Sequence, residues 1–135
     1  YRFVPSVAPL KEKYRISDRY GYRTHPISGE RQFHAGLDMA AVYAATVHAA
    51  ASGTVTFAGE TPGYGKTVVV THRFGFQTRY AHLTLIYTRK GAKVEKGDVI
   101  GFVGSTGIST GNHLHYEVIK NQKRINPLNF IYGTK

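Results

Sequence analysis

The sequence predicts a single, mostly β domain built on an antiparallel sheet. Short apolar runs alternate with glycine turns from residue 18 onward, and the 135 residues include 15 glycines. Aromatic residues that favour strands are common, with 10 Tyr and 7 Phe. No segment shows a long 3.6-residue periodicity, so we expect helix to be a minor component.

The first segment, residues 1–17, contains two prolines and mixed charge with little periodicity. We interpret it as a lead-in arm or a linker from an upstream region. The chain begins with Tyr rather than Met, so we interpret it as a processed or excised fragment in which any signal peptide or membrane anchor would not be visible. An upstream regulatory domain of the same protein is a candidate partner. The β domain is expected over residues 18–132, followed by a tail at 133–135.

Five runs of strand length follow within that domain, each bounded by turn residues. They cover residues 53–59, 66–74, 76–87, 92–107 and 113–120. The apolar run at residues 39–51 is too short and too rich in alanine to cross a bilayer. We therefore expect no transmembrane span in this chain.

Charge and cysteine content limit the partners and the chemistry. The formal net charge of +10 favours polyanionic surroundings such as nucleic acid, anionic lipid or the anionic polymers of a bacterial wall. Charge alone does not choose among these. Cysteine is absent, which excludes disulfides and thiolate metal ligands.

The stretch GNHLHYEV at residues 111–118 places two histidines one residue apart. In a β-strand, His113, His115 and Glu117 share one face, because alternate side chains leave the same side. Paired imidazoles contribute little to a core. They fit either a face that holds a metal ion or a reacting water, or the exposed polar face of an edge strand.

Two further motifs carry groups that bind metals or transfer protons. His34 and Asp38 lie four residues apart, so a helical turn, or a strand leading into a tight bend, brings their side chains together. Gly36 between them would permit the bend. In RYAHLTL, at residues 79–85, Tyr80 and His82 are expected to share one strand face.

A fourth motif, YGYRTHPISG at residues 20–29, places Arg23 and His25 before a proline turn. These two side chains either meet a substrate or belong to a turn stabilised by the His-Pro pair. His48 and His72 lie in apolar or strand-end surroundings. We expect them to be hydrogen-bonded or exposed rather than metal ligands.

Zinc suits this set of side chains. A catalytic zinc takes three protein ligands of the imidazole and carboxylate type and leaves one position for water. Two histidines and one aspartate meet that count, and two histidines remain to take a proton and to hydrogen-bond an oxyanion. Calcium and magnesium require more oxygen ligands. Iron remains an alternative by ligand type.

The motifs HAGLD, YAHL and HLHYEV, in that order, resemble the M23 family of zinc metallopeptidases of the lysostaphin/LytM type. The similarity extends through DRYGYRTHPISGERQFHAGLDMAA, GTVTFAG, GYGKTVVVTHRFGFQTRYAHL, GAKVEKGDVIGFVGSTGISTGNHLHYEV and INPLNF. The chain departs from the family pattern at residues 44–46, where Ala-Ala-Thr replaces a Gly-Thr-Pro turn, and at His48.

The resemblance implies one Zn²⁺ per chain with His34, Asp38 and His115 as ligands, and His82 and His113 as the unligated catalytic pair. The residues alone indicate these five but do not separate His113 from His115. The resemblance also implies an antiparallel sheet crossed by a substrate groove, the LytM/lysostaphin-like fold of the duplicated hybrid motif type.

By the same resemblance, the expected function is hydrolysis of peptide cross-links in bacterial peptidoglycan, in the periplasm or elsewhere in the cell envelope. The loop GYRTHPISGERQFH resembles the corresponding loop of enzymes that cut D-alanyl–diaminopimelate cross-links. It is less similar to that of glycyl-glycine endopeptidases. Arg23, His25 and Tyr80 are candidates for substrate binding, with a packing role as the alternative for Tyr80. Glu117 is either a partner of a ligand histidine or an exposed carboxylate.

Two other classes of function are alternatives. A non-catalytic or autoinhibited wall-binding module on the same fold is the first, although no ligand is missing from the motifs. A carrier or nucleic-acid-binding domain is the second. We expect no nucleic-acid partner, because such a partner leaves the histidine set unexplained. A biotinyl or lipoyl carrier needs a lysine at a hairpin tip, and no convincing one is found.

Overall fold

Strands dominate the part of the chain that the computed structural model describes, which is residues 3–24, 31–107 and 111–130. Within these ranges the elements are β1 (Arg15–Asp18), β2 (Gly21–Thr24), β3 (Arg31–His34), β4 (Leu37–Ala40), β5 (Thr46–His48), β6 (Gly53–Thr61), β7 (Gly65–Thr71), β8 (Phe76–Ile86), β9 (Lys93–Val94), β10 (Val99–Val103), β11 (His113–Lys120), β12 (Lys123–Ile125) and a 3₁₀ helix (Pro127–Asn129). The predicted β class and the minor share of helix are confirmed.

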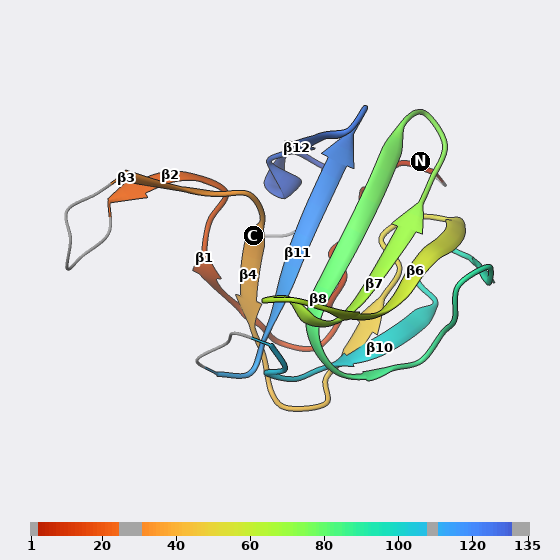
Figure 1. Ribbon diagram of the computed structural model, residues 1–135, viewed down its shortest axis with the longest axis horizontal. Helices are drawn as coiled ribbons and strands as arrows, with labels where there is room; N and C mark the ends of the chain where they lie inside the picture. The colour runs from red at the N-terminus through yellow and green to blue at the C-terminus, as the bar shows by residue number, and fades with distance from the viewer. Residues whose placement is uncertain (1–2, 25–30, 108–110, 131–135) are drawn as a thin grey trace.

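The strands form one large antiparallel sheet and a separate hairpin (Figure 1). The large sheet runs in the order β1-β4-β11-β8-β7-β6-β9, with β10 pairing to β5 and β8, and β12 pairing to β11. The hairpin of β2 and β3 projects from one side of this sheet in Figure 1. Its second strand leads directly into β4, so the hairpin adjoins the edge of the sheet formed by β1 and β4.

Two tight turns fix the register of the long strands. Phe74 and Gly75, between β7 and β8, both have positive φ, at 64° and 80°. Asn121 and Gln122, between β11 and β12, also have positive φ, at 50° and 68°. Two consecutive residues of this kind are typical of type I′ hairpins, whose twist matches that of the flanking strands.

The core lies on one face of the central strands. Leu37 and Met39 of β4, and Leu114 and Tyr116 of β11, are fully buried there. The alternate residues of the same two strands point to the other face, as strand geometry requires. The alternation predicted for residues 113–118 therefore holds, and it leaves the histidines of β11 on the face opposite the core.

The segment before β1 packs onto this domain. Leu10 is only 3% exposed and forms an isolated bridge with Val47 of β5. The Pro9 carbonyl accepts a hydrogen bond of 2.7 Å from the His48 amide. Within the described ranges, no helix is long and apolar enough to cross a membrane.

Candidate metal centre

Strand register brings together three side chains that are distant in the sequence. His115 of β11 lies opposite Asp38 of β4 on one side and opposite Ala81 of β8 on the other. His34 ends β3, and the two-residue link to β4 turns its ring back over Asp38. The motif thus adopts the strand-and-bend arrangement, which was one of the two predicted for it.

The ligand atoms of His34, Asp38 and His115 all lie within 4.8 Å of one another. His34 Nε2 lies 3.3 Å from Asp38 Oδ2, and His115 Nδ1 lies 2.7 Å from Asp38 Oδ1. Asp38 therefore directs one oxygen toward each histidine, and the three donors face a common point.

In both histidines, the ring nitrogen that faces away from Asp38 is engaged by a hydrogen-bond acceptor. His34 Nδ1 donates to the Arg19 carbonyl at 3.0 Å. His115 Nε2 donates to Glu117 Oε2 at 2.8 Å. A carbonyl or carboxylate oxygen only accepts, so His34 Nδ1 and His115 Nε2 carry protons. The other nitrogen of each ring faces the Asp38 carboxylate, and it would have to be deprotonated to bind a metal. Such contacts fix the orientation and tautomer of ligand histidines in metal sites.

Glu117 lies beneath His115 and is fully buried. Besides His115, its carboxylate accepts hydrogen bonds from Tyr64 Oη at 3.0 Å, Arg79 Nη1 at 3.3 Å and Arg124 Nε at 3.0 Å. A buried carboxylate needs such compensation, because an unpaired one is strongly disfavoured. Of the two interpretations open for Glu117, the structure agrees with the partner of a ligand histidine.

These contacts set the charge states at the site. Burial alone would raise the pKa of Glu117, but hydrogen bonds and charges from His115 and Arg124 lower it to about 2. Burial would also raise the pKa of Asp38, which the hydrogen bonds from His115 and His34 instead hold well below its ordinary value. Burial would lower the pKa of His115, whereas Asp38 and Glu117 raise it to about 9. Both carboxylates are therefore anionic and ready to neutralise a cation.

His82 and His113 form a second pair beside this cluster, with ring centroids 4.8 Å apart. His82 Nδ1 donates to the Thr106 carbonyl at 2.7 Å, and His113 Nδ1 donates to the Gly111 carbonyl at 3.0 Å. In the neutral ring, Nε2 is then the basic nitrogen. Burial is the main reason that the pKa of His82 is lowered, which keeps this ring neutral near pH 7.

His82 reaches the site through a local irregularity of β8. Its φ is +64°, and the pairing of β7 with β8 shifts register between Lys66 and Val68. A non-glycine residue with positive φ in a strand is strained, and bulges of this kind redirect side chains next to active sites. His82 thereby faces the cluster, with its ring 6.2 Å from that of His115.

The prediction that Tyr80 and His82 share one face is wrong for this reason. Tyr80 keeps the regular alternation and is fully buried in the core. Its hydroxyl contacts the Thr78 hydroxyl at 2.7 Å and accepts from the Ala50 amide at 2.9 Å. Contact with a substrate does not fit this position, and Tyr80 has the packing role that was the alternative.

Two of the remaining histidines, His48 and His72, make hydrogen bonds outside the cluster. His48 is bonded through both ring nitrogens, to Thr46 Oγ1 and the Gly97 carbonyl. His72 is buried and donates to the Ser52 carbonyl, which agrees with the expectation that it is hydrogen-bonded. His25 lies outside the described residues. Arg23 lies in β2, but its side chain is outside the described part, so substrate binding by these two remains a prediction.

Gly36 is required because there is no room for a side chain at this position, and not because of an unusual backbone angle. A Cβ at this position would lie 2.7 Å from the Tyr116 carbonyl oxygen and 2.8 Å from His115 Cε1. Contacts this short do not occur in proteins, so the link between β3 and β4 can pass over His115 only with glycine there. The sequence indicated a bend at Gly36, and the close approach is the stronger requirement.

Sequence reasoning missed the supporting residues around Glu117. Tyr64 packs its ring against His115, with centroids 5.5 Å apart, and Arg79 lies over the Tyr64 ring. Arg124 comes from β12, seven positions beyond Glu117 along a hairpin. Only the contact of Arg124 could have been predicted from the sequence, through its spacing from Glu117 along the hairpin. Tyr64 and Arg79 are distant from Glu117 in the sequence and reach it only in the folded structure.

This donor set fits a zinc ion. Two imidazoles and one carboxylate converge, the ring tautomers are held by outer contacts, and two carboxylates supply negative charge. Among the described residues, the cluster offers too few oxygen ligands for calcium or magnesium. The side of the cluster toward His82 and His113 would remain open to water and a substrate.

Comparisons with known proteins show which family this chain resembles. The pattern of the family described as "Peptidase family M23" matches residues 32–127. The DD-carboxypeptidase/endopeptidase Mpg of Neisseria meningitidis serogroup B is 48% identical over 120 residues, which cover 89% of this chain and 28% of that protein. The peptidoglycan DD-endopeptidase ShyA of Vibrio cholerae is 37% identical, with coverage of 89% and 28%.

A solved structure, described as a zinc containing peptidase from Vibrio cholerae, superposes with a TM-score of 0.84 at 32% identity. The match covers 95% of this chain and 40% of that one. The chain thus spans well under half the length of these similar proteins. The predicted fold class is confirmed by this superposition and by the strand content described above.

Proposed function

The chain belongs to peptidase family M23, and we propose that it is a zinc-dependent endopeptidase that hydrolyses peptide cross-links in bacterial peptidoglycan. One observation carries the proposal: His34, Asp38 and His115 converge next to His82 and His113, whose Nδ1 atoms donate to backbone carbonyls. A purely structural metal site is closed by a fourth protein ligand, whereas a catalytic one leaves that position open.

We assign the metal to His34 Nε2, a carboxylate oxygen of Asp38, and His115 Nδ1. A zinc ion bound there supplies Lewis acidity toward the scissile carbonyl and toward water. The similarity to a structure described as zinc containing supports zinc over iron. Glu117 and the Arg19 carbonyl hold the two rings in the required orientation.

His82 and His113 handle the protons. The lowered pKa of His82 keeps Nε2 available to accept a proton from the attacking water. The imidazolium that forms can donate to the leaving amine, and His113, across a ring distance of 4.8 Å, can hydrogen-bond the oxyanion in its protonated form. Water attacks the carbonyl directly, without an acyl-enzyme.

We favour D-alanyl–diaminopimelate cross-links as the substrate over glycyl-glycine bridges. Support comes from two relatives named for DD-endopeptidase activity, one of them 48% identical to this chain. The net charge of +10 suits an anionic wall. Such a substrate places the protein in the periplasm or elsewhere outside the cytoplasm, and an upstream regulatory domain remains part of the proposal.

Digestion of purified peptidoglycan sacculi tests the proposal. Sacculi of the diaminopimelate type and of the pentaglycine type are incubated with the chain, with chelator, and with zinc restored. Mass spectrometry then identifies the products. We expect zinc-dependent loss of cross-linked dimers from the diaminopimelate sacculi, with the pentaglycine sacculi left intact.

Two variants complete the design. His113→Ala should abolish cleavage while zinc still binds, because His113 is not assigned as a ligand. His48→Gln, which changes a histidine remote from the cluster, should cleave like the parent chain. One bound zinc without any cleavage would instead indicate a masked enzyme or a wall-binding module.

A further inference from the structure

A cleft of about 410 Å³ opens beside the metal cluster. Asp38 and His113 form the part of its lining that belongs to the site, and Arg15 of β1 and Asn112 form much of the rest. The cleft therefore starts at the reacting centre and leads away from it along β1. The proposed function does not yet give this cleft an occupant.

Strand register defines the shape of the cleft. Arg15 pairs with Ala40, and Ala40 pairs with His113, so the three side chains form one row across β1, β4 and β11. They face away from the core, because Ile16 and Met39, next to Arg15 and Ala40, pack toward it. The small Ala40 methyl lies between two long side chains and leaves a trough between them.

The row of Arg15 lies next to the row of the metal ligands. Asp38 precedes Ala40 by two residues on the same face, a step of roughly 7 Å along a strand. Arg15 and His113 are separated by two strand spacings, roughly 10 Å. A side chain of the length of arginine can therefore place its guanidinium about one substrate residue away from the bond that the cluster would cleave.

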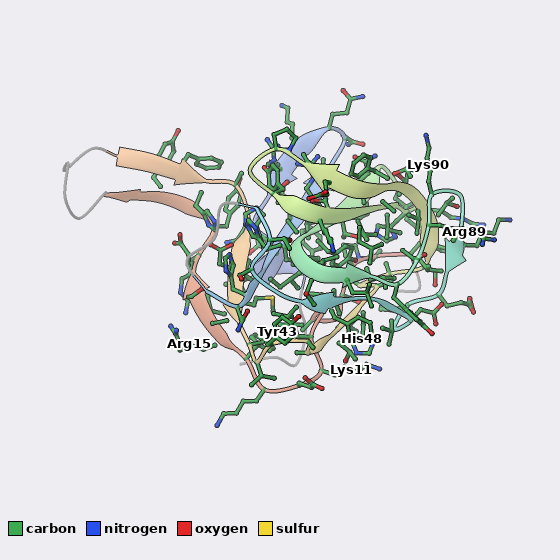
Figure 2. The ribbon with its side chains drawn as sticks, turned by 60° about the horizontal axis from the view of Figure 1, so that its bottom comes forward. Lys11, Arg15, Tyr43, His48, Arg89 and Lys90 are labelled. Atoms are coloured by element: carbon green, nitrogen blue, oxygen red, sulfur yellow. The ribbon has the colours of Figure 1, made fainter. Side chains whose placement is uncertain are left out.

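Arg15 is exposed, and no hydrogen bond or ion pair engages its guanidinium among the described residues. Figure 2 shows its side chain extending outward from β1. The acidic groups of the cleft have other neighbours: Asp38 contacts His34 and His115, and Asp18 lies 3.9 Å from His34 Nδ1. The cleft therefore holds a cation that is available to an anionic ligand.

The chemistry of a DD bond provides such an anion. In a terminal D-alanyl-D-alanine peptide, the residue whose nitrogen is released carries a free α-carboxylate. In a D-alanyl–diaminopimelate cross-link, the released amine likewise sits on a D-centre that carries a free carboxylate. In a glycyl-glycine bridge the same position is an amide that continues the chain. A cation one residue from the cleaved bond therefore distinguishes these substrates.

We propose that Arg15 binds the free carboxylate of the residue on the leaving-amine side of the scissile bond and thereby selects DD substrates. The inference rests on the proposed function and names a specificity determinant for it. The guanidinium can engage a carboxylate through two parallel hydrogen bonds, a geometry that lysine cannot reproduce. The same contact would serve terminal and cross-linked DD peptides alike, because both carry the free carboxylate at this position.

Binding of a phosphinate analogue of D-alanyl-D-alanine tests the inference without turnover. The free acid and its carboxamide are titrated into the zinc-loaded chain by calorimetry. We expect the free acid to bind about 10- to 100-fold more tightly than the carboxamide, the range for a hydrogen bond to a charged group. Arg15→Gln should remove this preference, and Arg15→Lys should restore part of it.

Lys13→Gln is the matched control, because Lys13 is an exposed cation two residues earlier that does not line the cleft. It should keep the full preference, and all variants should keep the zinc affinity and melting temperature of the parent. Equal binding of acid and carboxamide to the parent chain, or an unchanged preference in Arg15→Gln, would overturn the inference. Failure of either ligand to bind would overturn it as well.

Hydrolysis of a D-alanyl–diaminopimelate cross-linked muropeptide dimer, with its leaving-side carboxylate free or amidated, is measured in parallel and separates the two proposals. A preference for the free acid that depends on Arg15, without hydrolysis, would retain the carboxylate subsite and reject the catalytic function. Hydrolysis that proceeds equally with acid and carboxamide substrates would retain the function and reject the role of Arg15.

Discussion

Tyr80 and Tyr116 pack together in the core, with ring centroids 5.4 Å apart, but their hydroxyls differ in their surroundings. The Tyr80 hydroxyl contacts Thr78 and accepts from the Ala50 amide. Among the described residues, the buried Tyr116 hydroxyl has no hydrogen-bond partner. A buried polar atom without a partner opposes folding, whereas one with partners favours it.

These two tyrosines give a matched pair of substitutions. Tyr80→Phe should lower the free energy of unfolding by about 1–3 kcal/mol, because it leaves the Ala50 amide without its acceptor. Tyr116→Phe should leave it unchanged or raise it by up to about 1 kcal/mol. Urea unfolding of both variants and the parent measures the difference. Equal losses in the two variants would contradict the assignment of their hydroxyls.

Glu117 is the residue on which the orientation of His115 depends most. Glu117→Gln should weaken zinc binding by about 10- to 100-fold, as loss of an outer-shell carboxylate does in other metal sites. Glu60→Gln changes an exposed carboxylate on β6 and should bind zinc like the parent. Competition with a fluorescent chelator measures both affinities. Unchanged zinc affinity in Glu117→Gln would mean that Glu117 does not act through His115.

For single residues, the sequence predicted which side chains form the candidate site, but it did not predict the role of each one. Alternation placed His113 and His115 on one face, and the spacing of His34 and Asp38 predicted their contact. The choice between His113 and His115 as the ligand came only from the family resemblance. In the structure the two differ through their outer contacts, a carbonyl for His113 and a buried carboxylate for His115, and no local pattern encodes those contacts.

Among the elements, the link between β3 and β4 is the one that the site constrains most tightly. Gly36→Ala should destabilise the domain by about 1–3 kcal/mol and weaken zinc binding, because the added methyl overlaps the Tyr116 carbonyl and the His115 ring. Gly59→Ala is the control, since its Cβ would meet only Phe57 at an ordinary 3.6 Å. Thermal unfolding and zinc titration report the two effects. Equal behaviour of the two variants would contradict the close approach.

Strand positions followed from the alternation of apolar runs and glycine turns, and residues 76–87 and 113–120 correspond closely to β8 and β11. The departure at His82 did not follow, because a bulge changes the direction of a side chain without changing the pattern of residue types. The β2–β3 hairpin was expected only as a loop, because its sequence was interpreted through the His-Pro pair and the family resemblance.

For the whole molecule, stability should depend on pH through His72, which is remote from the metal centre. Burial lowers its pKa below the ordinary value of 6.5, although the bond to the Ser52 carbonyl acts in the opposite direction. Because the unfolded chain then binds a proton more readily, the contribution of His72 is complete above about pH 6.5 and is lost as pH falls through the folded pKa.

Urea unfolding between pH 7.5 and pH 5, with zinc saturating, measures this dependence. The parent chain should lose stability toward acid with a slope from His72 of at most about 1.4 kcal/mol per pH unit. His72→Gln, which does not titrate, should show a smaller slope, even though its stability at pH 7.5 is lower. An identical slope in parent and variant would remove His72 as the source.

The central claim is that His34, Asp38 and His115 form one metal site at which a peptidoglycan cross-link is hydrolysed. It is tested most directly by titrating the metal-free chain with zinc while recording bound metal and the cleavage of a D-alanyl–diaminopimelate cross-linked muropeptide. We predict that both signals saturate together at one equivalent, and that His115→Ala loses both. Cleavage that proceeds without metal, or one equivalent of zinc bound equally well by His115→Ala, would contradict the account.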